Sequence, residues 1–319
     1  MARPAKSFTT IEQQIAILQR RGMLLEADHA AIWLRSIGYY RLSGYWYPYR
    51  KIREGPERRG DEFVPETKLE YATRLYEFDR KMRTLVHDGL ERVEVALRSE
   101  LGYLLGSKDP MSYEDKEVFR PNFNHEEWLQ GVKKKIDRAR DRSAPIKHHL
   151  KNYTGIPVWV LIDHIDFSDA SKLFAGLRSE DQRQVSERMS VSIDSALLTP
   201  SLRERVKRNN PLADWLRQLT VLRNSCAHHA RIWNRSFAPA STNAIRTIRE
   251  LQSLPVGQSE QLYGALLLIG YLLQGISPGT TWTSKVRELV ATAYAPIPGR
   301  TTQEMGFPET WRNEALWRE

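Results

Sequence analysis

Six polar side chains that could carry acid–base or phosphate chemistry lie close together in the sequence. They are Arg217, Arg223, Asn224, His228, His229 and Arg231. A neutral histidine can accept or donate a proton near pH 7. An arginine can bind a phosphate through two parallel hydrogen bonds and stabilise additional charge on it. An asparagine can orient the imidazole ring or the phosphate. These residue types favour chemistry on a phosphate ester.

The surrounding sequence favours a reaction that needs no metal. There is no nearby acidic cluster to hold magnesium, so two-metal nuclease chemistry is disfavoured. The metal-free reaction open to these residues is RNA transesterification, in which the ribose 2′-OH attacks the adjacent phosphodiester. Histidine would move protons, and arginine would stabilise the phosphorane-like transition state. We therefore expect no metal and no cofactor. For an arbitrary Arg-x4-His pattern, however, a structural histidine and surface arginines are the commoner outcome.

Helical geometry separates two of these residues. The segment from residue 212 to about 230 is predicted to be one helix. On it, one face would carry Asn224, His228, Arg231 and Arg217. Arg223 and His228 would be about 140° apart with a rise of about 7.5 Å. They would not touch unless the helix ends or bends between them. Cys226 would point into the core, and His229 ranks below His228 as a candidate.

The charge of the chain favours an anionic partner. The formal net charge is +9 and the sequence pI is about 9.6, which is typical of nucleic-acid-binding proteins. The densest positive charge lies in residues 133–151, with eight Lys or Arg against two Asp. The candidate RNA contacts here are Lys133, Lys134, Lys135, Arg138, Arg142, Lys147, His148 and Lys151. The alternative is an ordinary solvated face.

The cysteine content and the apolar segments of the chain indicate its cellular location. The single cysteine, Cys226, excludes an internal disulfide and a cysteine-rich zinc site. The segment "MARPAKSFTT" has no apolar run typical of a secretory signal. The most apolar segment, 262–276, is shorter than the ~20 residues that cross a bilayer. We expect a cytoplasmic protein that does not enter a membrane.

The 3.6-residue periodicity of apolar side chains predicts an all-α fold. Helices are expected from a capping box at Thr9 and Glu12 to about residue 21, and at 28–37, 69–104, 180–190, 201–208, 212–230, the 260s and 284–294. Residues 157–177 should form two short helices, and 51–67 a loop or short hairpin. We expect a single domain, 1–319. It would comprise an N-terminal segment (1–66), a helical body (67–298) and a docked tail (299–319) with two tryptophans.

The stretch "YYRLSGYWYPYR", residues 39–50, is rich in rings and arginines. It could fill the core or stack on nucleic-acid bases. A Ser-Gly break at 43–44 prevents one flat array, so we predict a division of roles. Tyr40 and Trp46 should pack inward against the long helix. The residues expected to face RNA are Arg41, Tyr47, Tyr49 and Arg50.

The block "LRNSCAHHARIWNR" resembles the Arg-x4-6-His signature of HEPN-superfamily ribonucleases, with Asn224 directly after the arginine. More closely, the chain resembles the Abi-like family of bacterial abortive-infection proteins, of the AbiD/AbiF type. The resemblance extends over almost the whole length. It includes "IGYYRLSGYWYPYR", "LYEFDRKMRTLVHDGLERVEVALRSEL", "PVWVLIDHIDFSDASKLF" and "MGFPETWR".

This resemblance implies an all-helical HEPN-like fold and a role in antiviral defence. It implies RNA as substrate or ligand, with Arg223, Asn224 and His228 in the active-site positions. It also implies a homodimer with one composite site, and a toxin-like RNase held or guided by a small structured non-coding RNA. A composite site would remove the need for Arg223 and His228 to meet on one helix.

The polar stripe of the long helix and the function of the protein each have more than one interpretation from the sequence. The polar stripe of the long helix could support the site by pairing with Arg223 or Arg217, or could form ordinary ion pairs. It includes Arg80, His87, Glu91, Glu94 and Arg98; Arg217 and Arg231 would join it around the site. The function could also be non-catalytic: a protein that scaffolds or sequesters a small RNA, or a protein-only interaction partner.

Overall fold

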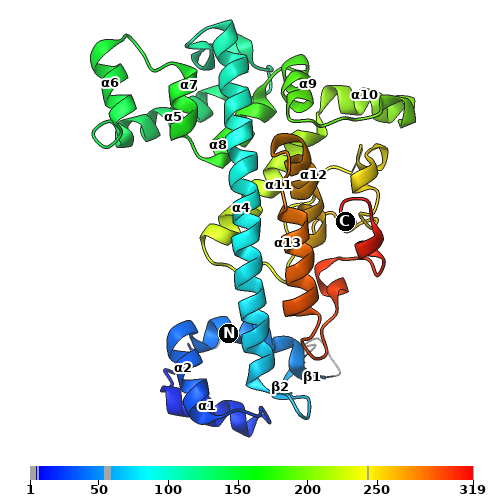
Figure 1. The fold of residues 1–319 in the computed structure, drawn as a ribbon. Helices are drawn as coiled ribbons and strands as arrows, with labels where there is room; N and C mark the ends of the chain where they lie inside the picture. Colours follow the sequence, from blue (N-terminus) through cyan, green and yellow to red (C-terminus); the bar gives the residue numbers. More distant parts are fainter. Residues whose placement is uncertain (1–4, 6, 54–58, 243, 319) are drawn as a thin grey trace. The chain divides into compact units, whose positions relative to one another are not determined.

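The computed structural model describes residues 5, 7–53, 59–242 and 244–318. α-Helices dominate them, and strands occur only as one short antiparallel pair (Figure 1). The predicted all-α class is therefore confirmed. The chain divides into two compact units. The first comprises Met1–Met82 and Glu288–Thr301, and the second comprises Arg83–Arg287 and Thr302–Glu319.

The first unit contains three short helices, the strand pair and the start of the longest helix. Its elements are α1 (Ile11–Arg20), α2 (Ala27–Ile37), α3 (Tyr39–Trp46), β1 (Arg50–Ile52), β2 (Arg59–Phe63) and the first part of α4 (Leu69–Lys108). The capping box of α1 is formed by Thr10 and Gln13, so the predicted pair, Thr9 and Glu12, was wrong by one residue. α2 ends at Ile37, as predicted, and is followed by Gly38, which has a φ of 87°.

The aromatic stretch is helical rather than irregular. Spacings of three and four residues place Leu42, Tyr45, Trp46 and Tyr49 on one buried face. The hydroxyl of Tyr45 donates to Oδ2 of Asp79 at 2.7 Å. Trp46 is buried as predicted, but Tyr40 is 92% exposed, so its predicted packing was wrong.

The predicted outward orientation of Tyr49 was also wrong. Tyr49 is 7% exposed, and its hydroxyl donates to the carbonyl of Pro298 at 3.0 Å. Arg41 and Tyr47 are exposed. Arg50 is partly buried and pairs with Asp61 at 3.3 Å. The ring that continues the buried helical face is therefore Tyr49, and Tyr47 lies outside it.

The second unit is built on the rest of α4. Its other helices are α5 (His125–Ala139), α6 (Ala144–Asn152), α7 (Val158–Leu161), α8 (Phe167–Gly176), α9 (Ser179–Arg188), α10 (Pro200–Arg208), α11 (Pro211–Ala227), α12 (Leu262–Ile276) and most of α13 (Trp282–Leu289). The predicted break near residue 167 lies between α7 and α8. Fully buried α4 side chains at helical spacing form the core, namely Val86, Leu90, Val93, Leu97 and Leu101.

Gly89 allows α12 to lie close beside α4 (Figure 1). A Cβ atom at this position would lie 2.7 Å from a methyl carbon of Ile269 and 2.9 Å from Nε1 of Trp282. That indole nitrogen donates to the carbonyl of Leu85 at 2.7 Å. The backbone of α4 is thereby fixed close to the residues that form the site described below.

The two tail tryptophans expected to dock on the body, Trp311 and Trp317, are buried. They form a ring cluster with Tyr263 and Phe307.

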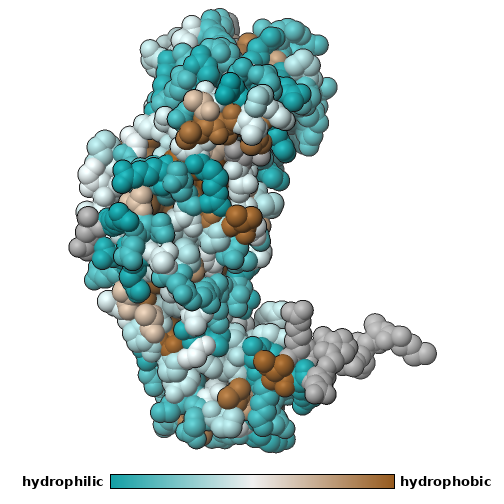
Figure 2. Space-filling model, turned by 90° about the vertical axis from the view of Figure 1, so that its right-hand side faces the viewer, coloured by the Kyte–Doolittle hydropathy of each residue, from teal (hydrophilic) through white to brown (hydrophobic). Residues whose placement is uncertain are grey.

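Over the part of the chain that the structure describes, no helix has both the length and the apolar character needed to cross a membrane. Figure 2 shows one face of the molecule, where hydrophilic side chains predominate and hydrophobic ones form small separate patches.

Candidate functional site

Helix α11 carries the Arg223 end of the candidate site. Its first turn is closed by Asn210, whose side chain accepts from the amide of Leu212 at 3.0 Å, and Pro211 occupies the first helical position. The buried face packs against α8 and α12. It consists of Leu212, Trp215, Leu216, Leu219 and Leu222. This packing fixes the rotation of α11 and places Arg223 at the border of the buried face.

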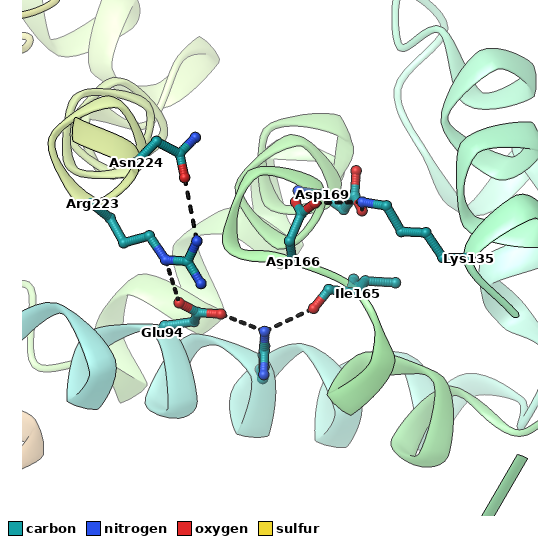
Figure 3. Close-up of polar contacts among 8 residues, drawn as sticks. Glu94, Lys135, Ile165, Asp166, Asp169, Arg223 and Asn224 are labelled. Carbon is teal, nitrogen blue, oxygen red and sulfur yellow. Dashed lines mark hydrogen bonds and ion pairs between the residues drawn. The ribbon is translucent and has the colours of Figure 1, made fainter. Parts of the chain in front are cut away.

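Arg223 is oriented by a carboxylate from α4 (Figure 3). Its Nε lies 3.6 Å from Oε2 of Glu94. Its Nη1 donates to Oδ1 of Asn224 at 3.4 Å. Glu94 is buried, with a side chain only 10% exposed, whereas Arg223 is partly exposed. Nη2 of Arg223 makes no hydrogen bond to another described residue, so it can reach a ligand.

Glu94 also binds a second arginine. Nη2 of Arg98 donates to Oε1 of Glu94 and, at 2.7 Å, to the carbonyl of Ile165. The carboxylate thus lies between two guanidinium groups, one from α4 and one from α11. The three side chains together carry one net positive charge, which suits the binding of an anion.

α11 ends immediately before the two histidines. Ala227 is its last residue, so the predicted helix to about 230 was too long. The amide of His229 donates to the carbonyl of Cys226 at 3.0 Å, and the amide of Ala230 donates to Ser225 at 2.9 Å. His229 has a φ of 54°. These two hydrogen bonds and the left-handed residue form a Schellman motif.

The chain that follows this turn is held by α4. Nη1 of Arg83 donates to the carbonyl of Ala230 at 3.4 Å, and Ile232 and Trp233 are buried. The guanidinium of Arg231 lies over the Trp233 ring at 5.7 Å. Arg231 therefore lies beyond the end of the helix. The prediction that it shares a helical face with Asn224 was wrong.

His228 lies at the end of the helix. It is exposed, and its ring makes no hydrogen bond to another described residue. Its amide donates to the carbonyl of Asn224 at 3.0 Å. No hydrogen bond between the side chains of Arg223 and His228 occurs among the described residues. The structure thus brings Arg223, Asn224 and Glu94 together. His228, five residues after Arg223, is exposed to solvent.

A family model described as Abi-like protein matches residues 32–234. The chain belongs to the Abi-like protein family. The match includes α3, Glu94, Arg98 and the turn at His229. No curated protein matches the chain significantly, and no solved structure does either. Membership of the family suggests a function in abortive infection for this Abi-like protein.

Other side chains predicted to support the site lie elsewhere. Arg217 pairs with Asp214 at 3.6 Å, so of the two pairings considered for the stripe of α4, the one with Arg223 forms, through Glu94. Arg80 belongs to the first unit and pairs with Glu77 at 2.8 Å. His87 and Glu91 are exposed. Of the predicted stripe, the structure brings only Glu94 and Arg98 into the cluster with Arg223, within the part of the chain described.

The basic segment of the Abi-like protein contains both structural and unpaired cations. Lys135 donates to Asp166 and Asp169 at the start of α8 (Figure 3), and Lys133 pairs with Glu114 at 3.6 Å. His148 accepts from Asn152 through its ring. The exposed cations with no ion pair to another described residue are Lys134, Arg138, Arg142, Lys147 and Lys151.

The ion pairs between Lys135 and the start of α8 shift the pKa values of Asp166 and Lys135. Burial alone would raise the pKa of Asp166, but hydrogen bonds from Lys135 and from backbone amides hold that pKa below its usual range. Burial alone would lower the pKa of Lys135, but its two carboxylate partners raise that pKa overall. Lys135 is therefore a structural residue, not a free RNA contact.

Sequence reasoning missed Arg83, which holds the turn after α11. The available signal was an arginine at an inward position of α4, between Met82 and Val86, since a buried arginine requires a partner. It also missed Asp166 and Asp169 as partners of Lys135. No group of three or more His, Cys, Asp or Glu side chains with metal-binding geometry occurs within the described ranges.

Proposed function

We propose that this Abi-like protein is an antiviral, metal-independent endoribonuclease of the HEPN type, close to the AbiD/AbiF proteins and acting in the cytoplasm. One observation carries the proposal. Arg223 is oriented by the buried carboxylate of Glu94, and an exposed histidine without a partner among the described residues follows five positions later. An oriented guanidinium and a free imidazole are the groups that phosphodiester transesterification needs.

In the proposed reaction the ribose 2′-oxygen attacks the adjacent phosphorus. A 2′-O–P bond forms, the P–O5′ bond breaks, and the products are a 2′,3′-cyclic phosphate and a 5′-hydroxyl. His228 takes the 2′-OH proton or supplies the proton to the 5′-oxygen. Arg223 hydrogen-bonds to the non-bridging oxygens, whose charge grows in the transition state. Asn224 helps to hold the guanidinium.

Both proton transfers are needed in one turnover, and one chain offers a single unpartnered histidine directly at this helix end. A homodimer that brings two such turns together would provide one His228 as base and the other as acid. We therefore include a homodimer through the Arg223–His228 face in the proposal. It also removes the need for the two side chains to meet within one copy.

A second function, RNA binding without cleavage, is favoured by a separate observation. Five exposed cations on α5, α6 and the turn between them have no ion pair among the described residues. Such cations gain most by neutralising phosphates. A structured non-coding RNA bound here could hold or guide the nuclease in a toxin–antitoxin-like arrangement. The same surface would alone suffice for a protein that scaffolds or sequesters a small RNA.

The deciding experiment incubates purified protein with mixed RNA in EDTA. We expect cleavage with 2′,3′-cyclic phosphate ends, lost in His228→Ala and in Arg223→Ala. His29→Ala, which removes another exposed imidazole, is the control and should leave cleavage intact. Absence of cleavage by the wild-type protein, or cleavage that survives His228→Ala, would refute the nuclease. RNA that co-purifies at low salt and dissociates as salt rises would then support the binding function.

A further inference from the structure

A groove of about 580 Å³ opens beside the Glu94 cluster, between α4 and the segment formed by α7 and η4 (Ile162–His164). Its lining includes Arg98, Ser99, Tyr103, Trp159 and Asp163. All of these residues belong to the second unit. The groove combines aromatic rings with a cation and hydrogen-bonding groups, a composition typical of sites for flat polar ligands.

The close packing of the Trp159 ring on α4 depends on Gly106, and Gly102 lies beside the Trp159 backbone. A Cβ atom at Gly106 would lie 3.1 Å from ring carbon Cε3 of Trp159. At Gly102 it would lie 3.7 Å from the Cα of Trp159. The helix therefore presents bare backbone where the tryptophan is seated. The Trp159 side chain nevertheless remains 51% exposed, and Tyr103 is 67% exposed. Two large rings at one groove are thus open to solvent instead of filling the core.

Arg98 connects this groove to the Arg223 cluster. One of its nitrogens, Nη2, binds Glu94 and the carbonyl of Ile165. Its Nε and Nη1 make no hydrogen bond to another described residue. Arg98 thus lines the groove while sharing the carboxylate that orients Arg223. A ligand chain bound at Arg223 could continue past Arg98 into the groove.

A second cation already uses one of the rings. The guanidinium of Arg188 lies 4.8 Å from the centre of the Tyr103 ring and pairs with Glu100 at 3.6 Å. The ring of Tyr103 therefore accepts a planar, positively charged neighbour. Nη1 of Arg98 offers a hydrogen-bond donor beside exposed rings. Such a combination suits a base attached to a phosphate and does not suit an apolar peptide.

We propose that this groove binds one nucleobase of an RNA strand, next to the phosphate held at Arg223. The base stacks on the exposed ring of Trp159, and Arg98 contacts the adjoining phosphate. The exposed Asp163 carboxylate accepts a hydrogen bond from the exocyclic amino group of the base, so adenine, guanine and cytosine are preferred to uracil. The placement beside a reacting phosphate rests on the proposed nuclease, whereas base binding does not.

The test compares nucleoside 5′-monophosphates with ribose 5-phosphate, measured by titration calorimetry on full-length protein. Stacking should make CMP bind about tenfold more tightly than ribose 5-phosphate. Trp159→Ala should remove this difference, Trp159→Phe should retain most of it, and Phe8→Ala, which removes an exposed ring outside the groove, should leave it unchanged. Asp163→Asn should reduce the preference for CMP over UMP.

Equal affinity for CMP and ribose 5-phosphate, or a difference that survives Trp159→Ala, would overturn the proposal. The proposal would also be overturned if Trp159→Ala changed the sedimentation of the protein but left nucleotide binding unchanged. That result would assign the groove to contact between two copies of the chain. If Trp159→Ala does not fold, Trp159→Leu, which keeps an apolar side chain but removes the ring, decides by the same criteria. Cleavage assays on the same proteins separate the two proposals. Base-dependent binding without cleavage upholds the groove and refutes the nuclease, and cleavage without base-dependent binding does the reverse.

Discussion

Oε2 of Glu94 lies 3.6 Å from Nε of Arg223, and the two residues come from different helices, α4 and α11. The Arg223 guanidinium therefore has an ion-pair partner far away in the sequence. Because the same carboxylate binds Arg98, a change at Glu94 reaches both arginines.

Glu94→Gln should lower both stability and activity. The amide keeps the shape of the side chain but leaves two guanidinium groups without a counter-charge. We expect unfolding to become easier by about 2 kcal/mol, as for hydrogen bonds to charged groups. The proposed RNA cleavage should fall on the order of 100-fold because Arg223 loses its ion-pair partner. Thermal unfolding and RNA cleavage measure the two effects. Glu91→Gln, an exposed neighbour on the same helix, is the control, and equal effects of the two changes would contradict the role given to Glu94.

The turn after α11 should discriminate between two small residues at position 229. Both His229→Gly and His229→Ala remove the imidazole, but only alanine must place a Cβ atom in the left-handed region. We expect the alanine variant to be less stable than the glycine variant by about 1 kcal/mol. Chemical denaturation of the two variants measures this difference directly. An alanine variant as stable as the glycine variant would show that the turn relaxes.

The neighbours Lys134 and Lys135 should respond oppositely to replacement by alanine. Lys134 is exposed with no ion pair among the described residues, so its loss should weaken RNA binding and reduce the slope of log K against log salt by about 1. Lys135 bridges to Asp166 and Asp169, so its loss should lower the unfolding temperature. Salt titrations of RNA binding and thermal melts test both statements. A stability loss confined to Lys134→Ala would reverse the assignment.

The Lys135 bridge also predicts loss of stability in acid. The pKa of Asp166 is held below its usual value, so the stability that it contributes is present above the unfolded-state pKa of about 3.9 and is lost as pH falls through the folded-state pKa. Asp166→Asn should therefore destabilise the protein more at pH 7 than at pH 3, which lies below the unfolded-state pKa. Denaturation curves at both pH values provide the comparison. A penalty that is equal at both would contradict the ionic contribution.

Tyr45 and Tyr40 provide a matched pair within α3. The Tyr45 hydroxyl is buried and donates to Asp79, whereas Tyr40 lies almost fully in solvent. Tyr45→Phe should cost about 2 kcal/mol, because it removes a hydrogen bond to a buried carboxylate. Tyr40→Phe should leave the unfolding temperature unchanged. A measurable loss in the Tyr40 variant would mean that its hydroxyl has a partner in solution.

The fold class and most helices could be predicted because apolar spacing reports directly on which helical face is buried. In α4, Val86, Leu90, Val93 and Leu97 all follow that rule. The start of α1 was misplaced because Thr9 and Thr10 are adjacent and each has a partner three residues later. Tyr40 and Tyr49 were misassigned because Ser43 and Gly44 were interpreted as a break, although tertiary packing keeps the segment helical.

The site could be predicted only in part. The types of Arg223, Asn224 and His228 indicate the chemistry, but the contact with Glu94 depends on how α4 and α11 pack. The end of α11 had no glycine to mark it. A histidine adopts the left-handed conformation there, which local sequence rarely reveals. The partners of Lys135 lie on another helix and were hidden for the same reason.

The cluster of one carboxylate and two guanidinium groups has consequences for thermodynamic linkage. Its residual positive charge is part of the folded state and disperses when the chain unfolds, so an anion that binds it binds the folded state selectively. Inorganic phosphate or RNA should therefore act as a stabilising ligand, raising the unfolding temperature with the logarithm of its concentration. The unfolding temperature would therefore report how much of the site is occupied by the anion, whether or not the protein cleaves RNA.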